Sequence, residues 1–466
     1  MKRKLSFLLI ITLLLPFSCH AQNFSITINS SNLKADSIHL KEFDGKKDFK
    51  DLTAAPRTEK CLLKLKDKIK PGMYQVYADT NILFDLLIST EKKQNLIVDI
   101  NDDGDVHFQN SQENENSQTY NKQIEAFQNE LKKLNQTFED AQKTMPQYML
   151  QTLAQSLMQQ FDTILAHENA YKQQVIAENP GTLLASMVKF SMDVNMPREY
   201  YGNQGLAMKF YAEHAFDNYP FDDPRMASTP PAHFKMQEYA GKLYYLEPDE
   251  AAKYADALLT KAQTDTTTYE AFFDHLEKIL GTLTSPYWTE EIYLAMLKNV
   301  LDYNKLCSMR MNYYKQVYNL HNKNLAGSIL PNFPLLMSDG TETTLYDIKC
   351  DYMLLYFQNP DCPTCTEVRE KLADNKELNR AIESGRLIML TVYFEKDEQL
   401  WRRYLKTKAN PKYLHAWDYK ATIDSESLFD LRIIPYMFLL DKDKRVIKKD
   451  IYHNEISDYL KKYKIY

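Results

Sequence analysis

Apolar and polar residues alternate along most of residues 23–110, as they do in strands that bury one face. Such runs predict strands at residues 24–28, 37–43, 61–66, 73–77, 82–88, 95–100 and 106–108. Pro71-Gly72 is a turn signal, and residues 101–105 (NDDGD) predict a sharp hairpin turn. The pattern predicts a β-rich domain over residues 22–110, either an antiparallel β-sandwich or a small barrel of the same strands.

The period of the pattern changes after residues 109–117 (QNSQENENS), which are polar and are interpreted as a linker. From Tyr120 to Phe138 apolar residues recur three and four positions apart, which predicts one long amphipathic helix. Further helices are predicted at residues 147–177, 182–192, 205–216, 249–263, 267–280 and 289–319, with breaks at 179–181 and at the proline-rich stretch 219–231. These elements predict an all-α domain over residues 111–325.

The chain from about residue 326 mixes short apolar runs with helical patterns. Residues 353–357 and 387–394 predict buried strands, and residues 397–406 an amphipathic helix. A third strand is predicted at residues 436–440, with a hairpin partner at 445–449 and a closing helix at 456–463.

Composition limits the class of protein. A length of 466 residues predicts about two to four domains, and a hydrophobic content of 44% is enough for packed cores. The formal charge of -6 and a pI near 6.0 argue against nucleic acid as a main partner.

The first 21 residues have the organisation of a signal peptide. Lys2, Arg3 and Lys4 form a charged start, and residues 5–15 form an apolar run shorter than the ~20 residues a membrane span needs. Residues 19–21 (CHA) have the small-residue spacing of a cleavage site. Lipidation of Cys19 is the alternative, but residues 16–18 (PFS) make a poor lipobox. We therefore expect an exported protein, in a periplasm or cell envelope.

Two cysteines, Cys362 and Cys365, follow the apolar run 353–357 and a polar turn, at the start of a predicted helix. Thiol–disulfide exchange needs a thiolate, and a helix N-terminus favours one through its free N–H groups and its dipole. Cys362 would attack a substrate disulfide, and Cys365, one turn inside, would resolve the mixed disulfide. Pro363 at the first helical turn removes no hydrogen bond that the helix needs.

Two other interpretations of the cysteine pair, a zinc site and a structural disulfide, agree less well with the sequence. Zinc usually takes four ligands, and neither a second CxxC nor an HxxxH is present, with His415 and His453 isolated. A structural disulfide this short stabilises little, because the closed loop is so small. The remaining cysteines of the mature chain, Cys61, Cys307 and Cys350, are scattered and form no disulfide framework. We expect no bound metal or cofactor.

Residues 327–466 resemble a thioredoxin-fold domain of the TlpA-like thiol–disulfide oxidoreductase class. The resemblance rests on the lead-in at residues 331–336 with Asp339-Gly340, then residues 345–348, the CxxC, and Ile434-Pro435 before a strand. The β-rich and helical regions resemble the domains of unknown function that precede thioredoxin domains in exported families. The resemblance implies an α/β thioredoxin fold over residues 326–466.

The family pattern also implies roles for further residues. Pro435 is expected to be a cis-proline beside the CxxC, with the backbone of Ile434 pairing with the substrate chain. Pro363 and Thr364, between the two cysteines, complete the expected substrate groove.

The chain departs from the family pattern in two places. Asp361 stands where relatives commonly have Trp, and its carboxylate opposes thiolate formation. The positions at which many relatives carry a buried acid hold Tyr356 and Val368, and Glu367 is one position away.

Two functions follow from these residues. The first is an exported thiol–disulfide oxidoreductase that acts on protein disulfides as a reductase, with electrons from a membrane thiol transporter. The second is a non-catalytic binding or envelope-assembly protein with a vestigial thioredoxin domain. The residues indicate no oligomeric state.

Overall fold

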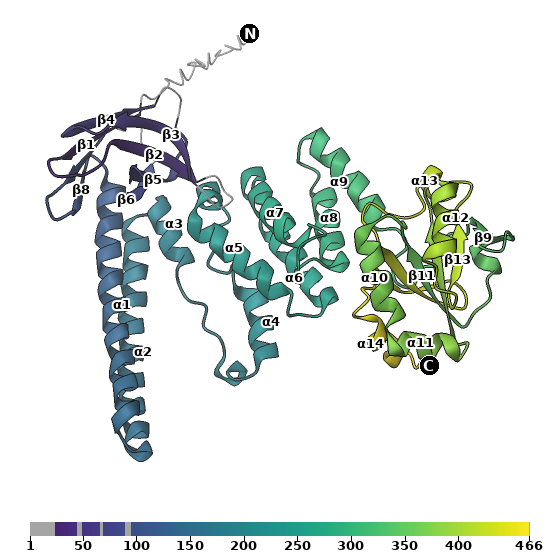
Figure 1. Cartoon of the computed structure of the whole chain (residues 1–466). Coiled ribbons are helices and arrows are strands. Elements are labelled where there is room, and N and C mark those ends of the chain that lie inside the picture. The colour runs from purple at the N-terminus through teal and green to yellow at the C-terminus, as the bar shows by residue number, and fades with distance from the viewer. Residues whose placement is uncertain (1–23, 44–48, 66–68, 89–94, 466) are drawn as a thin grey trace, which may run out of the picture. The chain divides into compact units, whose positions relative to one another are not determined.

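The computed structural model describes residues 24–43, 49–65, 69–88 and 95–465 (Figure 1). The predicted signal peptide, residues 1–21, lies outside the described residues. The chain divides into two compact units, the first ending at Leu306 and the second running from Cys307 to Tyr466.

The first unit begins with a β-sandwich, as predicted. One sheet has the strand order β4-β1-β7-β8 and the other β3-β2-β5-β6. Alternate residues of both sheets face inward and share a single apolar core, which is what defines a sandwich. The strands are β1 (Ser25–Ser30), β2 (Ser37–Phe43), β3 (Phe49–Pro56), β4 (Lys60–Lys64), β5 (Gly72–Ala78), β6 (Asn81–Ile88), β7 (Asn95–Ile100) and β8 (Val106–Gln109).

The sandwich differs from the sequence prediction in two ways. Strands β1 and β7 pair in parallel, whereas the other described strand pairs of the sandwich are antiparallel. Strand β3 was not predicted, because its sequence FKDLTAAP has no sustained alternation. It is an edge strand, at the end of its sheet, where less apolar burial is required.

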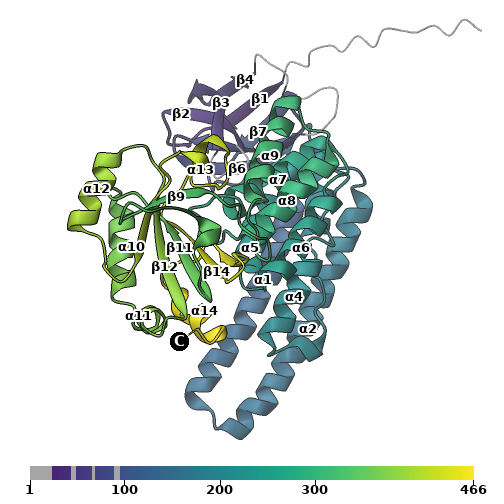
Figure 2. The same ribbon diagram turned by 90° about the vertical axis from the view of Figure 1, so that its right-hand side faces the viewer.

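The helical region follows and is all-α from α1 to α8, as predicted. The helices are α1 (Gln112–Thr144), α2 (Gln147–Glu178), α3 (Leu183–Phe190), α4 (Gln204–His214), α5 (Pro230–Leu243), α6 (Pro248–Lys261), α7 (Thr266–Leu280) and α8 (Glu290–Tyr303), with short 3-10 turns η1 (Arg198–Tyr200) and η2 (Pro224–Ser228). Figures 1 and 2 show α1 and α2 as a long antiparallel hairpin.

The predicted linker at residues 109–117 is wrong, because α1 already begins at Gln112. Its first turn is polar for a structural reason. The buried side chain of Asn114 accepts a hydrogen bond from the Leu87 amide (2.8 Å) and donates one to the Leu87 carbonyl (2.7 Å). Leu87 lies on β6, an edge strand, so Asn114 satisfies backbone groups that would otherwise lack a strand partner.

Two other helix predictions need correction. The proline-rich stretch 219–231 was interpreted as a break, but Pro230 and Pro231 lie in the first turn of α5, where a missing N–H is harmless. The single helix predicted at residues 289–319 is two, α8 and α9 (Ser308–His321). Asn304 ends α8 in the left-handed conformation, with φ of 49°, which asparagine tolerates better than most residues.

The second unit contains a seven-stranded sheet of order β10-β9-β13-β12-β11-β14-β15. Its strands are β9 (Pro334–Met337), β10 (Glu342–Thr344), β11 (Tyr352–Phe357), β12 (Leu387–Tyr393), β13 (Leu414–Trp417), β14 (Tyr436–Asp441) and β15 (Val446–Lys449). Its helices after α9 are η3 (Leu345–Asp347), α10 (Pro363–Ala373), α11 (Lys376–Glu383), α12 (Glu398–Thr407), α13 (Thr422–Ser425) and α14 (Ile456–Lys462).

The two faces of this sheet are buried in separate apolar clusters. One cluster joins β11, β12 and β14 to α10, α11 and α14. The other joins the opposite face to the segment around Phe333 and to the residues around α13. Strand β11 lies in the middle, parallel to β12 and antiparallel to β14, and its residues from Met353 to Phe357 are fully buried.

Helix α9 lies in the second unit, although the sequence analysis placed it in the helical domain. The buried Lys449 side chain on β15 donates to the carbonyls of His321 and Lys323, both at 2.8 Å, at the C-terminal end of α9. A cation at this end also suits the helix dipole. Asn324 donates to the Leu428 carbonyl at 2.9 Å, so two separate segments of the unit hold the end of α9.

Candidate redox site

The cysteine pair lies where strand β11 gives way to helix α10. Beyond the strand, the amide of Asp361 donates to the Asn359 side chain (2.8 Å), and the amide of Cys362 donates to the Asn359 carbonyl (3.1 Å). This turn reverses the chain and starts α10 with Cys362 as its N-cap and Pro363 in its first turn. The predicted strand–turn–helix context of the CxxC is therefore present.

The two cysteines differ sharply in accessibility. Cys362 is partly exposed, and its Sγ accepts a hydrogen bond from the Cys365 amide at 3.3 Å. Cys365, one turn inside the helix, is completely buried. The outer sulfur can therefore be reached from solvent while the inner one cannot.

The environment of Cys365 keeps its thiol protonated. Burial raises the pKa of Cys365 to about 12, and the hydrogen bond to Cys362 and its charge add to this effect. A backbone hydrogen bond from Asn359 and the positive charge of Arg369 act in the opposite direction.

Tyr356 occupies one of the positions where the resemblance to the TlpA-like class implied a buried acid. It lies on β11 with no exposed surface, and its hydroxyl donates to the Cys365 carbonyl at 3.0 Å. Burial raises the pKa of Tyr356 well above its usual range, so this phenol stays neutral. Val368 is buried, and Glu367 is exposed and pairs with Lys371. At these three positions the chain offers no buried carboxylate to Cys365.

The peptide bond between Ile434 and Pro435 is cis, as expected. In the pairing of β14 with β11, Tyr436 lies opposite Phe357, the last residue of β11. Pro435 therefore stands at the end of the sheet from which the chain runs on to the CxxC. Ile434 and Pro435 are partly exposed, and Pro363 and Thr364 are exposed.

The carboxylate of Asp361 has a cationic neighbour. Its Oδ2 lies 3.4 Å from the Arg403 guanidinium on α12, with both side chains largely exposed. An exposed pair of this kind contributes little to stability. It nevertheless places a positive charge beside the carboxylate that the sequence analysis expected to oppose thiolate formation.

Arg369 is a site residue that the sequence analysis missed. It lies four residues after Cys365, on the same face of α10. Its guanidinium donates to the buried Gln358 side chain and to the Thr366 hydroxyl (2.7 Å), and it lies 5.2 Å from the centre of the Tyr404 ring. The i, i+4 spacing was readable in the sequence, but only the fold brings Gln358, the residue after β11, and Tyr404 on α12 beside the guanidinium.

Among the residues that the structure describes, no group of three or more His, Cys, Asp or Glu side chains could hold a metal ion. None of the described helices combines the length and the apolar character of a membrane-spanning helix.

Comparison with known proteins agrees with this geometry. Residues 350–446 match a family model described as thioredoxin-like. The C-terminal domain is thioredoxin-like. Residues 109–324 match a domain of unknown function, DUF5106, which covers the helical region. No curated protein matches the chain.

Among solved structures, a thioredoxin-like protein from Bacteroides caccae is similar, with 26% identity and a TM-score of 0.53. The match covers 58% of this chain and 98% of that one. The matched part of this chain is longer than the whole second unit, so the similarity extends beyond the thioredoxin-like domain.

Two further structures match over 30% of this chain. The C-terminal domain of an uncharacterized protein from Bacteroides fragilis is 30% identical, with 98% of it covered and a TM-score of 0.29. The thioredoxin domain of a thiol-disulfide oxidoreductase from Bacteroides vulgatus is 19% identical, with 97% covered and a TM-score of 0.26. With scores this low, nothing about this chain is inferred from either.

Proposed function

We propose that this protein is an exported thiol–disulfide oxidoreductase that reduces disulfides of other proteins through Cys362 and Cys365. The asymmetry of the pair supports the proposal most, with Cys362 accessible at a helix N-terminus and Cys365 buried behind it. The thioredoxin-like fold adds support, since exchange with protein thiols suits this fold.

The first step joins the substrate to Cys362. The sulfur anion of Cys362 attacks one sulfur of a substrate disulfide, so that a mixed disulfide forms and the second substrate sulfur leaves and takes up a proton. The Cys365 amide already donates to the Cys362 Sγ, and the start of α10 carries partial positive charge. Both features suit a negatively charged attacking sulfur.

The second step releases the substrate. Cys365 loses its proton and attacks the Cys362 Sγ, which breaks the mixed disulfide and forms the Cys362–Cys365 disulfide. The substrate leaves with two electrons and takes up a second proton. The charge of Cys362 is one cause of the raised pKa of Cys365, and it disappears when Cys362 enters the mixed disulfide. Resolution therefore becomes easier at the moment when it is needed.

The substrate groove of this proposal is formed by the exposed residues around the cysteines. Pro363 and Thr364 border Cys362, and the Ile434–Pro435 segment would offer its backbone to the substrate chain. Electrons for the next cycle would come from a membrane thiol transporter. No cofactor is required.

The decisive measurement is the equilibrium reduction potential of the Cys362–Cys365 pair against glutathione. We expect a value below about -220 mV, as for reductants, whereas a value near -120 mV would mark an oxidant. A cysteine pair that never cycles would exclude catalysis and favour a binding protein with a vestigial thioredoxin domain. Asp361 beside Cys362, and the absence of a buried carboxylate at Tyr356, Glu367 and Val368, would then account for the inactivity.

Substitution of the outer cysteine separates the two functions directly. We expect Cys362→Ser to abolish the reduction of insulin disulfides, with Cys307→Ser, a change at an exposed cysteine outside the pair, as the matched control. If Cys362→Ser reduced insulin as fast as the unchanged protein, the proposed function would be wrong.

Export is tested by the mass of the mature N-terminus. The signal peptide predicts a chain that starts at Gln22. A lipid-modified Cys19 at the N-terminus would instead identify a lipoprotein, and a retained Met1 would contradict export by this segment.

A further inference from the structure

A large pocket lies in the first unit, between the outer face of the sandwich and the helical region. Its volume is about 870 Å³, near the upper end of the range for ligand sites. Strands β5 and β6 form one wall, and α1, α3, α4 and α5 form the others. Neither the CxxC nor any other part of the second unit contributes to it.

The walls of this pocket are unusually rich in methionine. Five line it, together with aromatic side chains that include Tyr120, Phe210 and Phe234; the methionines are Met73, Met187, Met192, Met196 and Met208. Methionine is flexible and polarisable, and surfaces built from it adapt to ligands of different shape. Phe234 is 60% exposed, so a large apolar ring remains accessible at this site.

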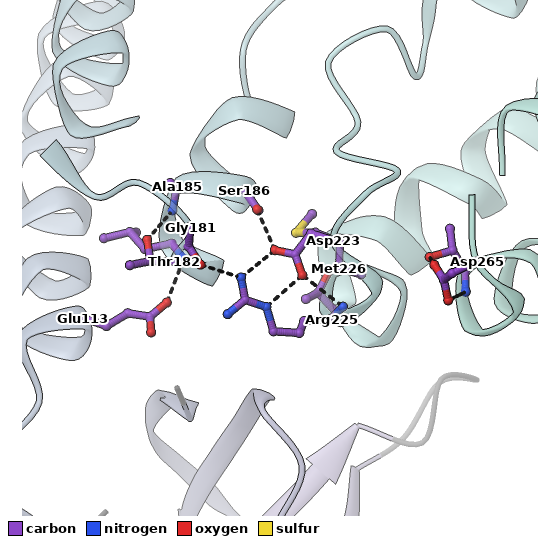
Figure 3. A network of polar contacts seen from close by, with 12 residues as sticks. Glu113, Gly181, Thr182, Ala185, Ser186, Asp223, Arg225, Met226 and Asp265 are labelled. Atoms are coloured by element: carbon purple, nitrogen blue, oxygen red, sulfur yellow. Dashed lines mark hydrogen bonds and ion pairs between the residues drawn. The ribbon is translucent and has the colours of Figure 1, made fainter. Parts of the chain in front are cut away.

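One wall of the pocket is held by a polar network that is partly buried (Figure 3). Glu113 on α1 accepts from the Leu184 amide in the first turn of α3 (3.0 Å), and Ser186 donates to Asp223 (2.7 Å). Asp223 also pairs with Arg225, whose guanidinium donates to the Gly181 carbonyl at 3.0 Å. Leu184 lines the pocket, so α3 is fixed to α1 and η2 at the position where it forms the wall.

The charges around the pocket are not evenly placed. On α5, Glu238 contacts both Lys242 (2.6 Å) and Lys235 (3.5 Å), and both cations lie over the Tyr211 ring. Glu238 compensates one of these two positive charges, so this wall keeps a net positive charge. On the sheet wall, Asp85 accepts a hydrogen bond from the neutral Gln75 side chain at 2.7 Å, which leaves its negative charge in place.

Asp85 is accessible from the pocket, yet protein surrounds it on several sides. Desolvation by these walls raises the pKa of Asp85, while the hydrogen bond from Gln75 acts in the opposite direction. A cation brought into the pocket would therefore find an incompletely compensated carboxylate in surroundings that exclude part of the water. The apolar walls and this carboxylate together define the chemistry of a suitable ligand.

We propose that this pocket binds an unfolded polypeptide segment of a partner protein, with Leu, Met or Phe side chains against the methionine walls and a Lys or Arg side chain on Asp85. A polypeptide suits the site because the pocket can accept several side chains and because methionine walls do not select a single shape. The site does not depend on the redox activity of Cys362, so it can be tested independently.

The test uses the mature chain and two fluorescein-labelled peptides without cysteine. Both have twelve residues rich in Leu, Met and Phe, one with two central Lys and the other with two central Glu. We expect fluorescence anisotropy to show at least about tenfold tighter binding of the Lys peptide, the change that about 1.4 kcal/mol represents. Asp85→Lys should reverse this preference, which a merely unfolded variant could not do.

A second pair of variants tests the methionine walls. Met208→Gln should weaken binding of the Lys peptide by about fivefold or more, because it removes apolar contact area from the wall. Met309→Gln is the matched control, since Met309 is 82% exposed and lies on α9, outside the pocket.

Three outcomes would overturn the proposal. The first is that neither peptide binds. The second is that both peptides bind equally, to the unchanged protein and to Asp85→Lys alike. The third is that a dansylated fatty acid binds in a Met208-dependent manner while the peptides do not, which would identify a site for small apolar ligands.

Discussion

Single residues decide the chemistry of the redox site through burial and the few charges within reach. Cys362 and Cys365 are the same residue type three positions apart, but only Cys365 is fully enclosed by protein. Asp361 has Arg403 beside it, and Cys365 has Arg369 on the same helix face. Arginine side chains therefore supply positive charge beside both Asp361 and Cys365.

The asymmetry of the cysteines predicts their order of alkylation. In the reduced protein at pH 8, we expect iodoacetamide to modify Cys362 and leave Cys365 unmodified, because Cys365 is inaccessible and its pKa is raised to about 12. Below that pKa the inner thiol keeps its proton, so its reactivity should rise only toward strongly alkaline pH. Peptide mapping by mass spectrometry checks this, and preferential modification of Cys365 at pH 8 would contradict it.

The same raised pKa affects stability. In an unfolded chain a cysteine has a pKa of about 8.5. Because the folded value is higher, the reduced protein binds this proton more tightly than the unfolded chain does, and its contribution to stability is complete below about pH 8.5. It is lost as pH rises from there toward 12.

Arg369 is predicted to act as a positioning residue that assists resolution by Cys365. Its charge lowers the pKa of Cys365, so Arg369→Gln should raise that pKa and slow resolution of the mixed disulfide by about tenfold, whereas Arg369→Lys should retain part of the rate. Single-turnover kinetics at a series of pH values would measure the rate of resolution of the mixed disulfide. In Arg369→Gln the pH at which this rate is half-maximal should be higher. An unchanged midpoint with a lower melting temperature would indicate a structural role only.

Elements join in this molecule through polar side chains that satisfy backbone groups at strand edges and helix ends. Asn114 does so between α1 and β6, Glu113 between α1 and α3, and Lys449 between β15 and α9. Each of these side chains is buried. A buried polar group of this kind stabilises only while its partner is present, so the junctions are sensitive to single substitutions.

Asn114→Ala should destabilise the first unit by about 1–3 kcal/mol, because it leaves the amide and carbonyl of Leu87 without these hydrogen bonds. Asn129→Ala is the control, since Asn129 lies on the same helix with an exposed side chain and should change stability by less than about 0.5 kcal/mol. Urea denaturation of both variants compares them, and equal midpoints would argue against the role of Asn114.

At the scale of the whole molecule, the two compact units meet in the sequence at residues 306–307, while the DUF5106 match continues to residue 324. Helix α9 lies within that difference. Its contacts with Lys449 and with the segment around Leu428 tie it to the thioredoxin-like domain. The independent stability of the second unit should therefore depend on α9.

A fragment of residues 307–466 should be more stable than one of residues 326–466 by about 2 kcal/mol or more. The shorter fragment loses α9, including the carbonyls of His321 and Lys323 that accept from the buried Lys449. Thermal unfolding of both fragments in the reduced form measures this difference. If the shorter fragment were equally stable, α9 would be dispensable to the domain.

The sequence by itself determined which segments form the main elements and where the candidate redox site lies. Alternation predicted seven of the sandwich strands, because it depends on neighbouring residues only. The CxxC pattern located the candidate redox site, and the resemblance to thioredoxin-fold proteins placed Ile434-Pro435 beside it. Segments whose character depends on distant partners were misjudged. The polar start of α1 resembles a linker, because its partner on β6 is distant in the sequence. Strand β3 lacks the alternation that identifies a strand in the sequence, because an edge strand pairs on one side only.

Only the tertiary structure decided how the residues combine. Burial separates the two cysteines, and the side chain of Arg369 contacts Gln358, just after β11, and Tyr404 on α12. The methionine pocket likewise gathers residues of six helices and strands, β5, β6, α1, α3, α4 and α5, which a sequence pattern does not bring together. Short-range patterns encode local conformation, whereas burial, pKa and cavities arise from long-range packing, which a sequence pattern does not specify.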